Sequence, residues 1–554
     1  MSRGIPTEAG TTGGEIRRQR VRRDLRIIIQ AWVFGSLWMW TINGATMTRF
    51  AKALGTPDWG FGVLAALPFV GTLFQLPASY YLERYGHRRR FFLIAATLHR
   101  LMWGLIAAVP WVPGIDGYRW QVMAGLLFVN WTAASASGPA WFNWMADVIP
   151  RKVRGRYFGI RNRIGMSIGL CTTLAIGYVL DLADFAEHQP GGAGTVLKVT
   201  SVMLAIAGLF GTLDIQLFRR VGDDHPPPKR QVVDLLAMLR VPLADRNFRR
   251  FLAYNFTLTL AVAFIGQYVW LYVFDVVGMS NKQANLLIIA MPLLMQLIAY
   301  PIWGGLMDRL GKKPVMLICG TMVITGSLGW LFLGQDAAAD INWGGGMWQI
   351  VIGLTGWNWG WTSWLGYGAV LLTTFAWPGV EVANFNLILD MSSPHRPSAR
   401  KMPSGGRGGT AYVAVNSLVV AVAGILSGLL AIFVAAALKP LMTEVVHFAG
   451  MTLSYHAVLF AVSTVLRAVA VLLAMGLHEP TAVGTRAALQ FMTGLFYSNV
   501  REAVTLPTRI MGQASRWSFL MSVPWRKRFR FGDRPEETVE TQDSPAAYSP
   551  EDEH

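Results

Sequence analysis

The chain has 554 residues, of which 53% are hydrophobic and only 15% are charged, and its mean hydropathy is +0.38. This composition excludes an intrinsically disordered protein, which has few apolar residues and many charges. It also argues against an ordinary soluble enzyme, in which about a quarter of the residues are charged.

The apolar residues form long runs, most of them long enough to cross the roughly 30 Å hydrocarbon core of a membrane as helices. In chain order, the predicted spans are 27–50, 59–82, 90–112, 120–148, 156–182, 197–218, 250–275, 283–307, 314–335, 363–390, 410–437 and 453–477. The first run is longer than the core of a signal peptide, and no small-residue cleavage site follows it. The sequence therefore predicts an all-α polytopic membrane protein with twelve transmembrane helices.

Lysine and arginine alternate between the loops on the two sides of these spans. One side, which includes the basic segment 1–26, carries 39 of the 49 residues, and the other side carries 6. Because positively charged loops stay in the cytoplasm, both termini are predicted to be cytoplasmic. The same distribution explains the net charge of +17 without a nucleic-acid partner.

A repeat relates the two halves of the chain. Spans two and eight each contain two prolines nine residues apart, and each is followed by a turn of the form acid-Arg-x-Gly-basic, about 225 residues from its copy. Spans four and ten share an Asn and an Asp four residues apart. Spans five and eleven carry Gly165/Gly169 and Gly424/Gly428, and small residues at this spacing let helices approach closely in lipid. We therefore predict two six-helix bundles, 27–218 and 250–477, joined by a cytoplasmic linker, 219–249.

These motifs resemble the major facilitator superfamily, whose loop between spans two and three reads Gly-x-x-x-Asp-Arg-x-Gly-Arg-Arg/Lys. The second copy, from Gly304 to Lys313, matches this pattern, whereas the first has Ser79 and Glu83 in place of Gly and Asp. The resemblance covers about residues 27–477 and implies two pseudo-symmetric bundles and secondary transport by alternating access. It also implies a conformational role for the signature loops, in which the glycines end helices in a left-handed conformation. The loop residues are Glu83, Arg84, Gly86, Arg88, Gly304, Asp308, Arg309, Gly311 and Lys312.

Two departures from the family's proton-coupled drug antiporters argue against that activity. Those proteins usually carry an Arg within span four and a Gly-Pro motif in span five. Here residues 121–146 contain no Arg, and residues 165–178 contain no proline. The phosphate-binding loop of ATP-driven pumps is also absent, so energy would come from an ion or solute gradient.

Ionisable residues inside membrane spans are expensive and are functional candidates by default. Glu381 lies nine residues before Asp390 on span ten, about 13 Å deeper along a helix. The neighbouring sequence Trp377-Pro378-Gly379 suggests a broken or kinked helix. Glu381 could bind the transported solute or take up a proton; the alternative is a structural ion pair. Arg100 and Arg467 fit structural pairing better.

Polar and aromatic side chains on spans one, four, seven and ten give a provisional binding site, because the resemblance implies that these spans line the cavity. Interfacial anchoring by Trp and helix-helix contacts by amides are the alternatives. The candidates are Asn43, Asn143, Asn255, Gln267, Asn384, Asn386, Trp40, Trp141 and Trp377.

Three further segments carry weaker signals. The Trp-rich stretch 342–368 fits an interfacial hairpin or a lid over the outer mouth. Residues 232–239 of the linker form a short amphipathic pattern. The tail 478–554 combines an amphipathic basic helix, which suits the anionic inner leaflet, with an acidic end that is expected to be disordered.

Two functions remain open from the sequence. The first is a transporter or facilitator for a small organic solute, with a proton or sodium as a possible companion, in the plasma membrane and more specifically a bacterial inner membrane. The second is a non-transporting sensor or scaffold of the same shape. A membrane enzyme is not supported, because no catalytic constellation, metal-ligand pattern or cofactor motif is evident. The predicted partners are the solute and the lipid bilayer.

Overall fold

A computed structural model describes residues 9–85, 87–150, 154–222, 235–333, 361–391, 408–442, 445–448 and 451–479. The chain divides into two compact units, Met1–Thr485 and Arg486–His554. The predicted features of the tail from 480 onward, most of the Trp-rich stretch and the start of the linker lie outside the described residues. The description below concerns the first unit alone.

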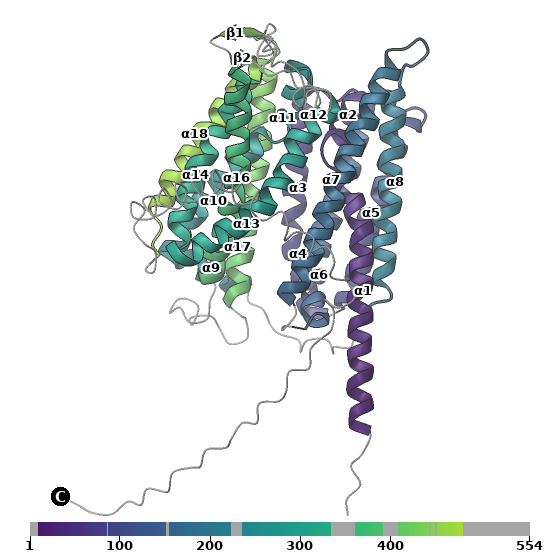
Figure 1. Cartoon of the computed structure of the whole chain (residues 1–554), viewed down its shortest axis with the longest axis vertical. Coiled ribbons are helices and arrows are strands. Elements are labelled where there is room, and N and C mark those ends of the chain that lie inside the picture. The colour runs from purple at the N-terminus through teal and green to yellow at the C-terminus, as the bar shows by residue number, and fades with distance from the viewer. Residues whose placement is uncertain are drawn as a thin grey trace, which may run out of the picture. The chain divides into compact units, whose positions relative to one another are not determined.

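Helices occupy the positions of all six spans predicted for the N-terminal half (Figure 1). They are α1 (Ala9–Ile42), α2 (Ala45–Ala53), α3 (Asp58–Leu73), α4 (Gln75–Tyr85), α5 (Arg88–Ala108), α6 (Arg119–Val148), α7 (Arg154–Glu187) and α8 (Thr195–Phe218), with short 3₁₀ turns at Val109–Trp111 and Asp116–Tyr118. We call this set the N-terminal bundle.

The second half repeats the pattern after a short linker helix, α9 (Leu235–Ala244). Its helices are α10 (Arg246–Ile265), α11 (Tyr268–Leu271), α12 (Asn281–Asn285), α13 (Met291–Leu310), α14 (Lys312–Gly329), α16 (Trp361–Met391), α17 (Gly408–Leu438) and α18 (Tyr455–Met475), with π-helical turns η3 (Tyr272–Val276) and η4 (Leu286–Ala290) and a 3₁₀ turn η5 (Trp330–Phe332). A small hairpin of β1 (Val446–Phe448) and β2 (Met451–Leu453), which the sequence did not predict, precedes α18. We call α10–α18 the C-terminal bundle.

The fold is an all-α membrane bundle of the predicted type. Within the described residues, ten helical segments are long and apolar enough to cross a membrane. The two remaining spans, four and ten, are the continuous helices α6 and α16, which are 30 and 31 residues long. The boundaries predicted for the two bundles and the linker stay predictions.

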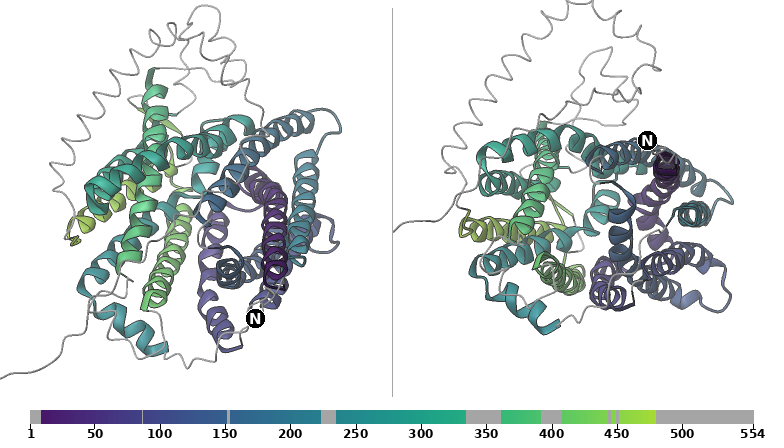
Figure 2. Two further views of the ribbon diagram at one scale, coloured as in Figure 1. Left: turned by 60° about the horizontal axis from the view of Figure 1, so that its bottom comes forward. Right: turned by 90° about the horizontal axis from the view of Figure 1, so that it is seen from below.

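The two ends of the helices, taken over both bundles, differ in the loops and short helices that they carry. The α4–α5 and α13–α14 turns correspond to two of the predicted basic loops, and we call the end at which they lie the basic end. The helices α2, α11 and α12 lie at the opposite, or far, end (Figure 1). The right-hand view of Figure 2 shows the helices of both bundles from below, with α1 near the edge of the N-terminal bundle.

Several predicted spans are interrupted at the far end, which the hydropathy pattern did not indicate. Span one breaks at Gly44, whose φ of 77° lies in the left-handed region that suits glycine. Span seven breaks at Gly266–Gln267, between α10 and α11, and continues as the π-helical η3. Pseudo-equivalent first spans of the two bundles therefore break at about the same level.

The apolar cores differ between the two ends. The larger cluster combines residues of both bundles, including Phe61 and Trp103 with Trp270, Tyr268 and Ala431. A second cluster, which contains Ile28, Leu82, Phe92, Trp144 and Phe218, comes from the N-terminal bundle alone. Since Leu82 and Phe92 flank the α4–α5 turn, this second core belongs to the basic end.

The paired glycines make the close approaches expected of them. A Cβ on Gly165 or Gly169 would run into the indoles of Trp32 and Trp40 on α1. On α17, Gly428 lies so near α3 that an added Cβ would be 2.7 Å from the Ala66 Cβ and 2.8 Å from the Gly62 carbonyl oxygen. The glycines of span eleven thus allow α17 of the C-terminal bundle to pack closely against α3 of the N-terminal bundle.

We expect Gly428→Leu to lower the free energy of unfolding by about 1–3 kcal/mol, because the new side chain must push α17 away from backbone atoms of α3. The matched control is Gly104→Ala on α5, where an added Cβ meets nothing within 4 Å. Thermal unfolding of the purified proteins in detergent measures both. Equal midpoints for Gly428→Leu and wild type would contradict the close packing.

Candidate functional site

Glu381 projects from the middle of α16 and is held by two neutral donors. The Tyr300 hydroxyl on α13 donates to Oε2 at 2.6 Å, and the Trp377 indole, one turn earlier on α16, donates to Oε1 at 2.8 Å. The expected break at Pro378 is not seen, because α16 runs without interruption from Trp361 to Met391. The carboxylate keeps acceptor capacity for another group, since each oxygen has two lone pairs.

A cavity of about 230 Å³ opens beside this carboxylate, and we call it the Glu381 cavity. Asn255 on α10 and Asn384 on α16 line it, as do Trp377 and, from the N-terminal bundle, Phe69 of α3. Asn255 also donates to the Asn416 side-chain oxygen at 2.7 Å, which fixes its orientation. Four of the predicted site residues therefore meet in one cavity that both bundles line.

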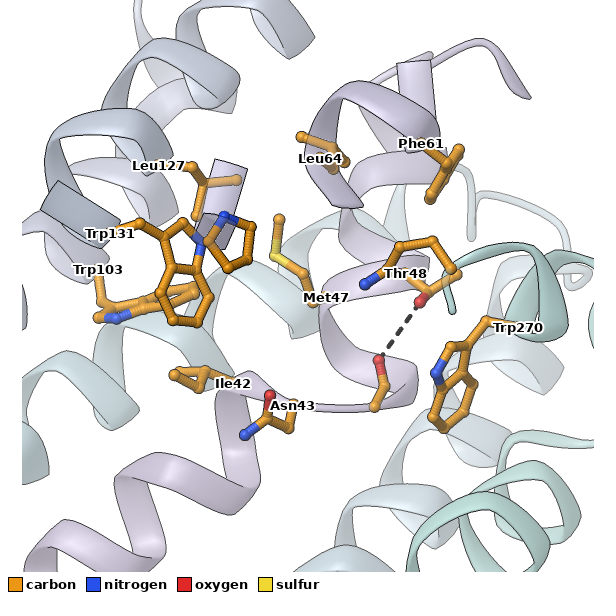
Figure 3. A pocket seen from close by; sticks show the side chains of 13 residues that line it. Ile42, Asn43, Met47, Thr48, Phe61, Leu64, Trp103, Leu127, Trp131 and Trp270 are labelled. Atoms are coloured by element: carbon orange, nitrogen blue, oxygen red, sulfur yellow. Dashed lines mark hydrogen bonds between the residues drawn. The ribbon is translucent and has the colours of Figure 1, made fainter. Parts of the chain in front are cut away.

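A second cavity, of about 90 Å³, lies where the broken spans one and seven face each other (Figure 3). Three indoles surround it, those of Trp103 on α5, Trp131 on α6 and Trp270 on α11, and we call it the Trp cavity. It contains two more of the predicted residues, Asn43 at the first break and Gln267 at the second.

The remaining predicted site residues lie elsewhere. Asn386 points toward the Met307 sulfur on α13, at 3.5 Å. Trp40 packs at Gly169, and Trp141 packs on Phe158 near the Arg161 guanidinium. The side chain of Asn143 lies outside the described residues. Helical periodicity alone did not distinguish these positions from the cavity-lining ones.

The signature turn of the C-terminal bundle binds groups of its own bundle. Gly311 has a φ of 93°, as the glycine of the motif requires. Lys312 pairs with Asp390 of α16, and the Lys313 ammonium donates to the carbonyl oxygens of Met475 and Leu477 at the end of α18, at 2.8 and 2.7 Å. The other turn shows the equivalent contact, since Arg89 donates to the Arg219 carbonyl oxygen after α8. A basic residue in each turn thus caps the last helix of its bundle.

The acidic residues of the two turns are Glu83 and Asp308, and an acidic side chain in this position can pair with a nearby Arg or with a helix N-terminus across the interface of the bundles. Asp308 and Arg309 are both exposed. A Cβ added to Gly304 on α13 would meet no other atom within 4 Å. Arg88 begins α5. Gly86 and the side chains of Glu83 and Arg84 lie outside the described residues. The conformational role of these turns stays a prediction.

Sequence reasoning missed a buried ionic cluster in the N-terminal bundle. Asp214 on α8 is 4% exposed and accepts a hydrogen bond from Arg100 at 3.2 Å. Asp214 is therefore the structural partner of Arg100. The Arg100 guanidinium lies 3.3 Å from the centre of the Trp38 ring, and Arg161 lies 3.5 Å from that of Trp32. The available signal was an aspartate inside the predicted span 197–218, next to the arginines already noted.

Polar contacts between the bundles gather at the far end. Asp184 on α7 accepts from the Asn281 amide of α12, in the other bundle, at 2.6 Å. Within its own bundle, Asp184 also binds Arg49 of α2. Asp181, one turn earlier on α7, accepts the Asn281 backbone N–H at 2.7 Å and so caps α12. We call these residues, together with Asn285, the far-end latch.

Asn285 is a deeply buried polar group of the latch, at 1% exposure. Its side-chain oxygen accepts the Ala45 N–H that the break at Gly44 leaves free, at 3.2 Å. Its amide nitrogen donates to the Thr173 carbonyl oxygen of α7, also at 3.2 Å. One side chain of the C-terminal bundle therefore binds two helices of the other bundle.

Two ion pairs join the bundles at the same end. Lys52 of α2 binds Asp275. Asp58, the first residue of α3, accepts from the Tyr455 hydroxyl at 2.7 Å and from the Lys439 ammonium at 2.9 Å. No cluster of His, Cys, Asp and Glu suited to a metal ion occurs within the described residues.

We expect Asp214→Asn to lower the free energy of unfolding by about 3–5 kcal/mol, because it leaves the buried Arg100 guanidinium without its carboxylate. Asp116→Asn is the control, since Asp116 pairs with Arg119 on the surface, where an ion pair contributes about 1 kcal/mol at most. Thermal unfolding in detergent compares the two. A loss no larger than that of the control would show that the cluster contributes little to stability.

Comparisons with known proteins agree with this geometry. The family model described as Major Facilitator Superfamily matches residues 32–399, which is more than half of the chain. A search of curated proteins by sequence finds no match.

Solved structures of transporters share the fold. A variant of the nucleoside transporter NupG has 10% sequence identity and a TM-score of 0.54, over 82% of this chain and all of the other. A D-xylose-proton symporter has 16% identity and a TM-score of 0.54, over 82% of this chain and 98% of the other. An auto-inhibited POT family peptide transporter has 13% identity and a TM-score of 0.54, over 83% and 99%.

Proposed function

The chain belongs to the Major Facilitator Superfamily and is a multi-pass membrane protein and a secondary transporter; we propose that it moves a small organic solute by alternating access around the Glu381 cavity. The observation that carries this proposal is a carboxylate in mid-span, in a cavity to which both bundles contribute residues. Movement of one bundle against the other would expose such a cavity first to one side of the membrane and then to the other.

The proposed state of the transporter is closed at the far end and open at the basic end. The far-end latch and the shared apolar core support closure at the far end. At the basic end, the contacts of Arg89, Lys312 and Lys313 stay within their own bundles. If the basic loops are cytoplasmic, as the charge distribution predicts, this state faces the cytoplasm, and a bacterial inner membrane fits the same orientation.

Glu381 is proposed to bind a positively charged or hydrogen-bond-donating group of the solute, or to carry a coupled proton. Its two partners, Tyr300 and Trp377, are neutral donors that orient the carboxylate without neutralising it. A cation from the solute, or a proton, would compensate the charge of this carboxylate. A sodium ion in place of the proton is the alternative for coupling.

Uptake of a panel of labelled nucleosides, sugars, amino acids and small peptides into proteoliposomes, with and without a pH gradient, tests this function. We expect at least one class to be taken up, and we expect Glu381→Gln to lower its initial rate at least tenfold. Tyr300→Phe should have a smaller effect, because it removes one of two hydrogen bonds to the same carboxylate. Asp116→Asn, on the surface, is the control.

Two outcomes would contradict the proposal. Unchanged binding and uptake in Glu381→Gln would remove Glu381 from the site. Binding of a solute without movement of any member of the panel would favour the non-transporting sensor or scaffold.

The far-end latch makes a separate prediction. Asp184→Asn weakens the charged hydrogen bond that Asp184 accepts from Asn281 of the other bundle. Such a bond contributes about 1.5–3 kcal/mol, so the population open at the far end should rise about tenfold or more. Labelling of Met47→Cys by a membrane-impermeant maleimide reports this opening, in a background in which Cys171 and Cys319 are replaced by serine.

The direction of the labelling change decides this prediction. Faster labelling in Asp184→Asn than in the Asp116→Asn control supports the latch. Equal rates in the two variants would mean that the contact between Asp184 and Asn281 does not hold the far end closed.

A further inference from the structure

The Trp cavity has the composition of a ligand site that differs from the Glu381 cavity. Small-molecule sites are lined mostly by apolar and aromatic groups with a few polar groups that fix orientation. Here three indoles, Phe61, Leu64, Leu127 and the Met47 thioether supply the apolar wall. The polar groups are the amides of Asn43 and Gln267 and the Thr48 hydroxyl, and none of the described lining residues is charged.

The two helix breaks place these amides at the cavity. Asn43 donates its amide N–H to the Met39 carbonyl oxygen at 2.7 Å, so its side-chain oxygen is left as an acceptor. Gln267 lies at the break between α10 and α11 in the opposite bundle. Broken helices of this kind border solute sites in membrane transporters because their free backbone and side-chain groups face a cavity rather than lipid.

The Trp cavity lies beyond the Glu381 cavity along the path toward the far end. Consecutive residues of α3 line the two cavities: Pro68 lines the Trp cavity, and Phe69 lines the Glu381 cavity. On the other side, Thr259 of α10 lines the Glu381 cavity and Gln267 lines the Trp cavity. These two residues are eight positions apart, which corresponds to about 12 Å along a helix. A small solute would therefore occupy the two cavities in turn.

The far-end latch borders the Trp cavity directly. Gly44 lines the cavity, and an added Cβ there would meet Asn285 and Ile289. The same Asn285 accepts the N–H of Ala45. An occupant of the cavity thus lies against the chain segment that must move when the far end opens.

We propose that the Trp cavity is a second binding station for the solute, and that it accepts a neutral, planar group of about the size of one aromatic ring with a hydrogen-bond donor at its edge. The indoles contribute flat apolar surface to a ring, and the Asn43 oxygen accepts from the donor. A charged group is disfavoured there, because burial without a charged partner is costly. The assignment rests on the proposed transport function and specifies part of the solute class.

Phenol is the probe, with benzoate as its charged counterpart, and binding to the full-length protein in detergent is measured by saturation-transfer NMR. We expect phenol to bind and benzoate to bind at least tenfold more weakly. Met47→Trp should weaken phenol binding at least tenfold by filling the cavity. Met203→Trp, at a half-buried methionine of α8 outside the cavity, is the matched control and should leave phenol binding unchanged.

A thermal unfolding curve would reveal misfolding of Met47→Trp. A second variant tests the cavity independently of Met47→Trp. Asn43→Leu removes the acceptor at the edge of the cavity and should weaken phenol binding several-fold. The proposal is overturned if phenol does not bind, if the cavity variants bind phenol as the wild type does, or if Glu381→Gln abolishes its binding.

Failure of this proposal and failure of the transport function give different results. A protein that takes up a solute in proteoliposomes but does not bind phenol would keep its function and lose the second station. A protein that binds phenol in a Met47-dependent way but moves no solute would keep the site and lose the transport function.

Discussion

The need to partner every polar group inside an apolar medium governs this structure. Backbone and charged groups that leave water must be satisfied within the protein, because hydrocarbon offers no hydrogen bonds. The break at Gly44 is tolerated because Asn285 accepts the N–H of Ala45. Arg100 can lie inside the N-terminal bundle because Asp214 accepts its hydrogen bond and Trp38 covers its face. Each interruption of the apolar pattern therefore fixes a specific tertiary contact.

Where those partners come from differs between the two ends of the molecule. At the far end the partners cross between the bundles, as when Asp181 of α7 caps α12 and Asp58 of α3 accepts from Tyr455 of α18. At the basic end Lys313 and Arg89 cap helices of their own bundles. A protein that must open at each end in turn needs contacts between the bundles that can be exchanged. Polar contacts serve this purpose, because water can replace them when the end opens.

The cavities follow from the same breaks. The Glu381 carboxylate is oriented by Tyr300 and Trp377 beside Phe69 of the other bundle. The Trp cavity forms where the broken first spans of the bundles meet. In our proposals, the Glu381 cavity binds a charged or hydrogen-bond-donating group, whereas the Trp cavity binds a neutral ring. Two sites of different polarity along one path would select a solute that carries both kinds of group.

The sequence by itself determined the spans, the duplication and the family, because hydropathy, charge alternation and turn motifs are local patterns that repeat along the chain. It also singled out Glu381, Trp377, Asn255 and Asn384 as candidates, which the structure brings to one cavity, because a carboxylate and amides in a span stand out against apolar neighbours. Only the tertiary structure separated these residues from Asn386, Trp40 and Trp141, since the faces of a helix acquire different roles through the helices packed against them. Likewise, Tyr300, Asn285 and Asp214 gain their roles from partners about 80 to 240 residues away in the chain, and no local pattern encodes such a contact.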